Sequence, residues 1–279
     1  MEKKQRIIIF FSLLLILFAS LSLIFGLKQT SKSPLPNATA TVFFHGYGSS
    51  KHAEEQMANY LVKHKYASSI VVADVVFQGK VKFTGNLAAK TKNFIVEVNL
   101  QNNKSANNMT YSQSSNYVAK VLSGLKKKWK INNVNLVAHS MGNLQVIYFI
   151  KNHGDSKKYP KINKLVAIAG HYNGIIGMDE PKETNLEANG KPKMMNDTYR
   201  DLLSVRNTSP KNIKVMNIYG NYKNHGDGSV NNNSSKSLRY LVQKRAKSYE
   251  EQEIRGYGAQ HSRLHENKEV DQILLKFLK

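Results

Sequence analysis

The sequence predicts an α/β fold in which a mainly parallel β-sheet carries helices on both faces. Short runs of strand-forming residues alternate with stretches of helical periodicity along the chain. Several runs, such as "VNLVAH" and "INKLVAIAG", are apolar throughout, which is typical of parallel strands buried on both faces. A chain of 279 residues with 41% hydrophobic residues can build one large core.

The expected strands are short segments rich in apolar and β-branched residues. The first, Thr39 to Phe44, runs into the glycine-rich loop "HGYGSS", and residues 68–85 read as two strands joined by a Gln-Gly turn. The remaining strands are expected at 93–100, 134–139, 162–170, 213–220 and 247–256.

The expected helices show apolar residues at helical spacing. Residues 53–65 place Met57, Tyr60, Leu61 and His64 on one side. Further helices are expected at 114–130, with Tyr117, Val121, Leu125 and Trp129 facing the core, at 141–154, closed by Gly154, and at 267–279, with Val270, Ile273, Leu274 and Phe277 on one face.

The polar stretch 171–212 lies between two expected strands and has little periodicity. It is too long for a plain connection between neighbouring elements. We therefore expect it to be a cap insertion within a single domain that spans residues 39–279.

The N-terminus contains an uncharged apolar run, Ile7 to Leu27, preceded by Lys3, Lys4 and Arg6. About 20 apolar residues match the hydrocarbon thickness of a bilayer, and the preceding basic residues keep the N-terminus cytoplasmic. We expect residues 1–27 to form a single-pass membrane anchor, residues 28–38 a linker, and the rest an extracytoplasmic domain. A cleaved signal peptide is the alternative, and it would leave the domain secreted.

The composition excludes some classes of function. The sequence has no cysteine, so thiol catalysis, disulfides and cysteine metal sites are excluded. The formal net charge is +22, with lysine spread along the chain. This charge fits a solvated surface of biased composition, and attraction to anionic cell-envelope polymers is the functional alternative. We expect no nucleic-acid binding, because arginine-aromatic clusters and known binding modules are missing.

The segment "AHSMG", Ala138 to Gly142, lies where a strand becomes a helix. A serine held at such a sharp turn, with small residues two positions away on either side, is the G-x-S-x-G nucleophile elbow with Ala138 in the first position. The simpler reading is a serine that only caps a helix. The strand before and the helix after favour Ser140 as a nucleophile.

A serine nucleophile needs a histidine base and an orienting acid. His261, on the loop after the last strand, is the favoured base, and His265 is the rival. Asp227 follows the strand that ends near Gly220, in a glycine-flanked turn, and is the favoured acid. The other carboxylates considered are Asp74, Asp179, Asp197 and Asp201.

Two backbone N–H groups are expected to form the oxyanion hole. The Met141 N–H lies at the start of the helix after Ser140, where the helix dipole favours a developing negative charge. The Tyr47 N–H follows Gly46, which lets the backbone approach closely. We expect His45 to orient this loop by hydrogen bonds.

Four motifs, "FFHGYGSS", "LVAHSMGN", "NIYGN…DGSV" and "AQHSRLHEN", together resemble the alpha/beta-hydrolase superfamily. They are most similar to the uncharacterised, lipase-like cell-surface hydrolases of Gram-positive bacteria. The resemblance covers about Thr39 to Lys279. It implies the alpha/beta-hydrolase fold and the roles of Ser140, Asp227 and His261 as nucleophile, acid and base.

The expected activity is that of a serine esterase or lipase that cleaves a small ester or lipid-like substrate through an acyl-enzyme. No metal or organic cofactor is required for this chemistry. An acyltransferase or amidase could use the same triad, and a non-catalytic surface protein that binds envelope polymers is the alternative from another class. The cap sequence has no long apolar segment, which favours short or medium acyl chains.

Overall fold

The computed structural model describes residues 34–279, except 77–78, 102, 105–107 and 224. Residues Leu35–Lys279 form one compact unit. The predicted anchor 1–27 and most of the predicted linker lie outside the described residues. Among the helices that the structure does describe, none is both long and apolar enough to cross a bilayer.

The unit is built on an eight-stranded sheet with the strand order β3-β2-β4-β1-β5-β6-β7-β8. β3 pairs with β2 in antiparallel fashion and all other neighbouring strands are parallel, so the predicted mainly parallel sheet is confirmed. The strands are β1 (Thr39–Phe44), β2 (Ile70–Val75), β3 (Val81–Thr84), β4 (Asn93–Leu100), β5 (Asn133–His139), β6 (Lys161–Ile168), β7 (Lys214–Asn221) and β8 (Ser248–Arg255).

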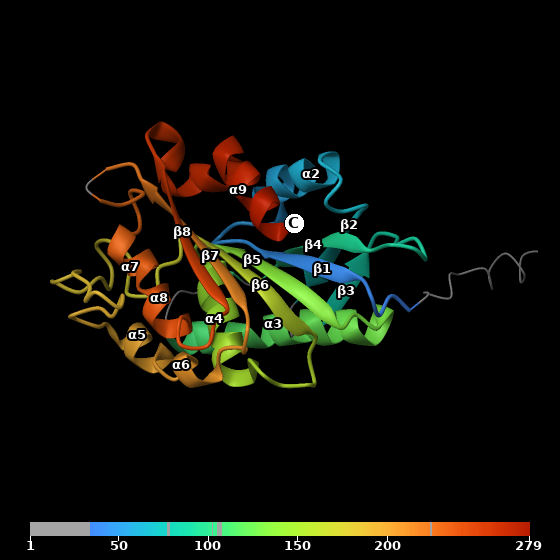
Figure 1. Ribbon diagram of the computed structural model, residues 1–279, viewed down its shortest axis with the longest axis horizontal. Helices are drawn as coiled ribbons and strands as arrows, with labels where there is room; N and C mark the ends of the chain where they lie inside the picture. The colour runs from blue at the N-terminus through green and yellow to red at the C-terminus, as the bar shows by residue number, and fades with distance from the viewer. Residues whose placement is uncertain (1–33, 77–78, 102, 105–107, 224) are drawn as a thin grey trace, which may run out of the picture. The chain divides into compact units, whose positions relative to one another are not determined.

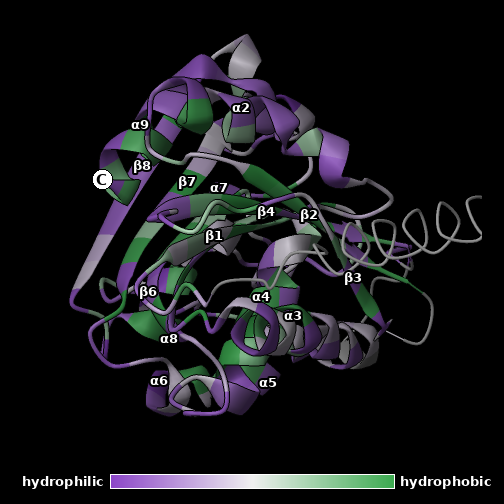
Figure 2. Cartoon of the chain, turned by 90° about the vertical axis from the view of Figure 1, so that its right-hand side faces the viewer, coloured by the Kyte–Doolittle hydropathy of each residue, from purple (hydrophilic) through white to green (hydrophobic). Residues whose placement is uncertain are grey.

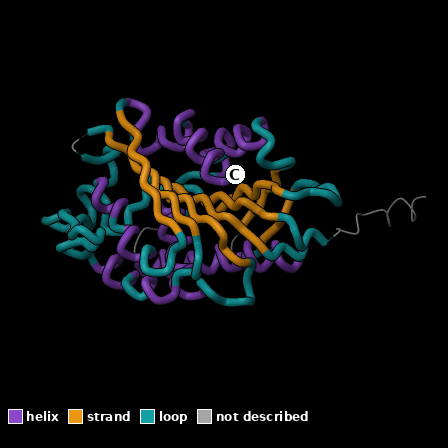
Figure 3. The backbone as a smooth tube through the Cα atoms, in the orientation of Figure 1, coloured by secondary structure: helices purple, strands orange, loops and turns teal. Residues whose placement is uncertain are grey.

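Helices cover both faces of this sheet, as the sequence predicts. The helices are α2 (Glu55–Lys63), α3 (Asn108–Trp129), α4 (Met141–His153), α5 (Asp197–Leu202), α6 (Val205–Thr208), α7 (Asn232–Lys236), α8 (Leu238–Val242) and α9 (Lys268–Leu278), with short 3-10 turns η1 (Lys51–Ala53), η3 (Tyr257–Ala259) and η4 (His261–Glu266). α2 and α9 lie on one face, and α3, α4 and α6 lie on the other (Figure 1). Figure 3 shows the strands as a layer between these helices.

Two apolar cores fill the space between the sheet and its helices. On the α3 and α4 side, Val121, Leu125 and Leu144 are fully buried against the sheet. On the α2 and α9 side, Leu61 and Leu274 belong to the second core. Figure 2 shows hydrophobic residues concentrated on the central strands. Each fully buried side chain of this kind contributes about 1.5–3 kcal/mol of transfer free energy.

Several details differ from what the sequence predicts, among them the start of α3 at Asn108 rather than at residue 114 and the short helices α7 and α8. His64 is exposed, although the helical spacing places it on the side of the buried Met57 and Leu61, and its ring stacks on Tyr60 at 3.9 Å between centroids. The segment 171–212 contains the short helices α5 and α6, which the sequence did not predict, and both contact α4. The role of this segment as a cap stays a prediction.

The parallel strands give the sheet two chemically distinct edges. The chain leaves β1, β5, β6, β7 and β8 at one edge, called the carboxyl edge, and enters them at the other, called the amino edge. Ligands of parallel α/β sheets bind beyond the carboxyl ends of strands. Ser140 follows β5 directly, so it lies at the carboxyl edge.

Candidate active site

Ser140 occupies a sharp turn between β5 and α4. Its backbone has φ 50° and ψ −123°, a conformation that residues other than glycine rarely adopt. Its N–H donates to the Ile168 carbonyl at 3.0 Å, so the turn stays attached to β6. A backbone held in this region stores about 1–3 kcal/mol, which the surrounding packing offsets.

Two glycines make the turn sterically feasible. A Cβ on Gly142 would lie 2.3 Å from the Phe44 carbonyl oxygen, so only glycine lets α4 start this close to the end of β1. A Cβ on Gly46 would lie 3.1 Å from the Ser140 Cβ and 3.6 Å from its Oγ. The loop after β1 therefore runs directly beside the serine hydroxyl.

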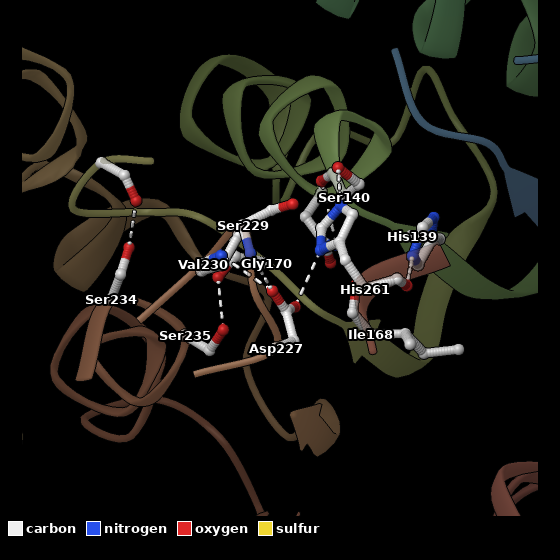
Figure 4. A network of polar contacts seen from close by, with 12 residues as sticks. His139, Ser140, Ile168, Gly170, Asp227, Ser229, Val230, Ser234, Ser235 and His261 are labelled. Atoms are coloured by element: carbon white, nitrogen blue, oxygen red, sulfur yellow. Dashed lines mark hydrogen bonds and ion pairs between the residues drawn. The ribbon is translucent and has the colours of Figure 1, made fainter. Parts of the chain in front are cut away.

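Ser140, His261 and Asp227 form a continuous hydrogen-bonded chain (Figure 4). His261 Nε2 lies 2.8 Å from Ser140 Oγ, and His261 Nδ1 lies 2.7 Å from Asp227 Oδ2. Asp227 is 1% exposed. This geometry lets the imidazole accept the hydroxyl proton while the carboxylate fixes its tautomer and orientation.

The turn at Asp227 explains why this carboxylate can be buried. Its Oδ1 accepts hydrogen bonds from the N–H groups of Ser229 at 2.9 Å and Val230 at 2.7 Å, which leaves Oδ2 for the imidazole. The His261 N–H also donates to the Asp227 carbonyl at 2.9 Å. Gly220 makes room, since a Cβ there would lie 2.0 Å from the Ala259 carbonyl oxygen. A buried carboxylate with these partners avoids the cost of an unpaired charge.

The rival histidine does not contact the serine. The His265 ring packs edge-on against the His139 ring, 5.0 Å away between centroids. His139 Nε2 lies 3.1 Å from the His261 carbonyl oxygen and can donate to it, which ties the residue before the nucleophile to the histidine loop. Burial, and then the charge of His261, lowers the pKa of His139 well below its usual value. Burial also lowers the pKa of His265, so both neighbours favour the neutral form.

His171 is a further buried histidine near His261. Burial, followed by the charge of His261, lowers its pKa to about 3. Its ring lies 5.8 Å from the Tyr111 ring of α3. The neutral imidazole of His171 therefore adds no positive charge beside the site.

The other carboxylates considered from the sequence have partners away from His261. Asp74 accepts from Asn99, Asp197 pairs with Arg200, and Asp201 pairs with Lys151. Asp179 accepts from the N–H of Ile175 at 2.9 Å and the amide of Asn196 at 2.9 Å. Of the five candidates, the structure brings Asp227 to the histidine.

Asn143 supports the serine turn, a role that was not predicted from the sequence. Its amide nitrogen donates to the carbonyls of Ile168 at 2.9 Å and Ser140 at 3.2 Å, and its oxygen accepts from Tyr172 O–H at 3.2 Å. These bonds join β6, α4 and the segment after β6. An amide in the first turn of a buried helix was the available signal, because such a side chain needs partners.

Met141 follows Ser140 in the chain, and Tyr47 follows Gly46, whose backbone lies beside the Ser140 side chain. Met141 is the first residue of α4, where the leading N–H groups have no acceptor within the helix. The Tyr47 side chain is 55% exposed, so a role at the site would use its backbone N–H. His45 is buried, and its ring bonds the Gly46 carbonyl and the Leu100 N–H, so its predicted orienting role is confirmed. Within the described residues, no three His, Asp or Glu side chains could together hold a metal ion.

Residues 28–279 match the family model described as an alpha/beta hydrolase of unknown function (DUF915). The chain belongs to this family. The match covers most of the sequence and confirms the resemblance predicted from the four motifs. No curated protein matches the chain.

Solved structures show the same fold. The product of a Listeria innocua gene is 23% identical, with a TM-score of 0.79 over 87% of this chain and 94% of that one. A Lactobacillus plantarum protein, whose assignment as a cell surface hydrolase is itself inferred, is 21% identical to this chain. Its TM-score is 0.70 over 88% of this chain and 91% of its own. An esterase from Pyrococcus furiosus is 15% identical with a TM-score of 0.50, over 87% and 81% of the two chains. At these identities the likeness concerns the fold alone.

Proposed function

We propose that this protein is a serine hydrolase of the carboxylesterase type, with Ser140 as nucleophile, His261 as base and Asp227 as orienting acid. The hydrogen-bonded chain from Asp227 through His261 to Ser140 is the observation that carries this proposal. Its position at a strained strand-to-helix turn, and membership of an alpha/beta-hydrolase family, support it further.

In the proposed reaction, Ser140 Oγ attacks the carbonyl carbon of an ester while its proton moves to His261 Nε2. The tetrahedral intermediate collapses to an acyl-enzyme, and His261 returns the proton to the leaving alcohol. Water then repeats the sequence: it loses a proton to His261, releases the carboxylic acid and restores Ser140. Asp227 Oδ2 accepts the Nδ1–H bond throughout and stabilises the imidazolium that forms in each half-reaction.

The N–H groups of Met141 and Tyr47 are the proposed oxyanion donors. Met141 begins α4, so the positive end of the helix dipole points toward the developing charge. Gly46 holds the loop backbone beside Ser140, and Tyr47 is the next residue. Losing one such donor costs about 10²–10³ in rate.

The proposed substrates are esters with short or medium acyl chains, acted on outside the cytoplasm. The predicted anchor at 7–27 would hold the domain on the outer side of the cell membrane. The description of the Lactobacillus plantarum neighbour as a cell surface protein supports this location. Recovery of the full chain in the membrane fraction, with the domain open to added protease, is the expected result. Release of the chain without detergent would contradict the anchor.

The test of the proposed activity compares residues 33–279 with the Ser140→Ala variant on p-nitrophenyl esters from acetyl to palmitoyl. We expect turnover that falls to background in Ser140→Ala and stays unchanged in Ser204→Ala, an exposed serine away from the site. A fluorophosphonate probe should label the parent protein and not Ser140→Ala. Labelling without ester turnover would favour an amidase or acyltransferase. No labelling would favour a non-catalytic surface protein that binds envelope polymers.

A further inference from the structure

Exposed lysines stand where the chain enters the strands of the sheet. They lie before or at the start of five strands: β4, β5, β6, β7 and β8. These strands are consecutive in the sheet apart from β1, which lies between β4 and β5. The lysines, called the basic edge below, are Lys92, Lys130, Lys161, Lys211, Lys214 and Lys247.

The strand pairing places these lysines in one row. The Lys161 N–H donates to the Asn132 carbonyl at 2.8 Å, and the Lys247 N–H donates to the Ile213 carbonyl at 2.8 Å, so the approaches to neighbouring strands lie side by side. Five strand spacings of about 4.8 Å separate β4 from β8. The basic edge therefore spans about 24 Å across the sheet.

Carboxylates do not neutralise this row. The segments 88–92, 126–132, 155–161, 209–214 and 243–248 contain one acidic residue, Asp155, which pairs with Arg245. Within the described part of the chain, none of the six lysines forms an ion pair. Long cationic side chains crowded without counterions raise the local positive potential.

The row continues into a cavity of about 350 Å³ between β8 and the end of α9. Lys164, Lys214, Lys276 and Lys279 line it, together with the carboxylate of Glu250. The Lys164 ammonium donates to the Phe277 and Leu278 carbonyls, which caps α9 at this edge. The cavity therefore extends the positive surface from the sheet edge onto the α9 side.

The carboxyl edge has a different character. The loops that follow β1, β4, β5, β6, β7 and β8 at this edge are 45–50, 101–107, 140–142, 169–175, 222–231 and 256–261, and they contain two lysines, Lys104 and Lys223, and one acidic residue, Asp227. A general bias toward lysine would place similar numbers of lysines in the loops at both edges. The concentration at one edge therefore points to a binding surface.

We propose that the basic edge binds the anionic headgroups of a lipid bilayer. A row of unpaired cations about 24 Å long suits an extended anionic surface at close range, since the attraction fades within a Debye length of about 8 Å. β1 begins at the same edge, and the 11 residues 28–38 separate it from the predicted anchor, a reach of at most about 40 Å. The predicted anchor would thus keep the edge within reach of the membrane, whereas an anionic polymer has no such link to this edge.

The test measures co-sedimentation of residues 33–279 with vesicles. Both apolar cores lie within the compact unit Leu35–Lys279, so we expect this part to fold without the preceding segment. We expect binding to vesicles of equal amounts of phosphatidylglycerol and phosphatidylcholine, weakening with added salt, and no binding to phosphatidylcholine alone. Each lysine contributes about a fivefold factor, so Lys211→Gln with Lys214→Gln should weaken binding about 25-fold.

A matched control removes two charges elsewhere. Lys182 and Lys223 are exposed and lie outside the basic edge, and their double glutamine variant should bind within twofold of the parent. Equal losses in the two double variants would show diffuse attraction and overturn the proposal. Tighter binding to soluble poly(glycerol phosphate) than to vesicles of equal phosphate content would assign the edge to an envelope polymer and also overturn it.

The vesicle assay is independent of the proposed hydrolase activity. The Ser140→Ala variant should bind vesicles as the parent does, because Ser140 lies at the carboxyl edge. If the protein hydrolyses esters but does not bind vesicles, the proposed membrane binding by the basic edge is refuted and the proposed function is not. Binding without hydrolysis would refute the proposed function alone.

Discussion

Replacing Asp227 with Asn should reverse the tautomer of His261, and the structure shows why. Asp227 Oδ1 accepts from two N–H groups, those of Ser229 and Val230, so the amide oxygen must take that position. The amide nitrogen then faces His261 Nδ1, which can only accept the bond if its proton moves to Nε2. A protonated Nε2 cannot take the Ser140 proton.

We expect kcat/KM to fall about 10⁴-fold in Asp227→Asn, as expected for a triad whose histidine holds the wrong tautomer. This loss corresponds to about 5.5 kcal/mol of transition-state stabilisation. KM should change little, because Asp227 is buried behind His261 and would not touch the substrate. The two backbone bonds to Oδ1 survive the substitution, so circular dichroism should show an intact fold.

The assay is initial-rate hydrolysis of the best p-nitrophenyl ester, with Asp179→Asn as the control. Asp179 was a candidate acid from the sequence, but its partners are Ile175 and Asn196, so its variant should keep full activity. A loss below tenfold in Asp227→Asn would refute the orienting role. Equal losses in both variants would refute the choice of acid.

Three further substitutions test the packing around the site and a buried carboxyl group. Ser140→Gly relaxes the φ of 50°, so the protein should be inactive but more stable to urea by about 1 kcal/mol, whereas Ser140→Ala should show no such gain. Gly142→Ala places a methyl group 2.3 Å from the Phe44 carbonyl oxygen and should lose about 2 kcal/mol in the same titration. Burial raises the pKa of the Glu54 carboxyl to about 8, so native stability should fall as pH rises from 4.5 toward 8. The free energy of unfolding of Glu54→Gln should therefore match that of the parent near pH 4.5 and exceed it by about 3 kcal/mol at pH 7. If the variant and the parent unfold at the same temperature at both pH values, the raised pKa is contradicted.

The serine turn was predictable because its constraints are local. Gly142 and Ala138 sit at fixed offsets from Ser140, and the contact of Gly142 with Phe44 shows why a small residue is needed there. The order of the elements then pointed to the loops that carry Asp227 and His261. Both loops follow strands that were predicted from the sequence, and parallel strands bring their carboxyl ends to one edge.

The supporting contacts were not predictable because they join residues far apart in the sequence. Asn143 bonds the carbonyl of Ile168, and His139 bonds that of His261, and neither pairing leaves a periodic pattern. The short helices α5 to α8 were also not predicted from the sequence. They contain four to six residues each, too few to show an apolar repeat, so packing rather than propensity sets them.

The parallel sheet also fixes a direction for the proposed enzyme. β5 is seven residues long, so Ser140 stands about 23 Å from the edge where the lysines gather. If the protein rests on a bilayer by that edge, and lies outside the cell as proposed, its serine would face away from the membrane. Diffusion in the membrane plane would then spread the enzyme over the cell surface, while its substrate would arrive from the opposite side.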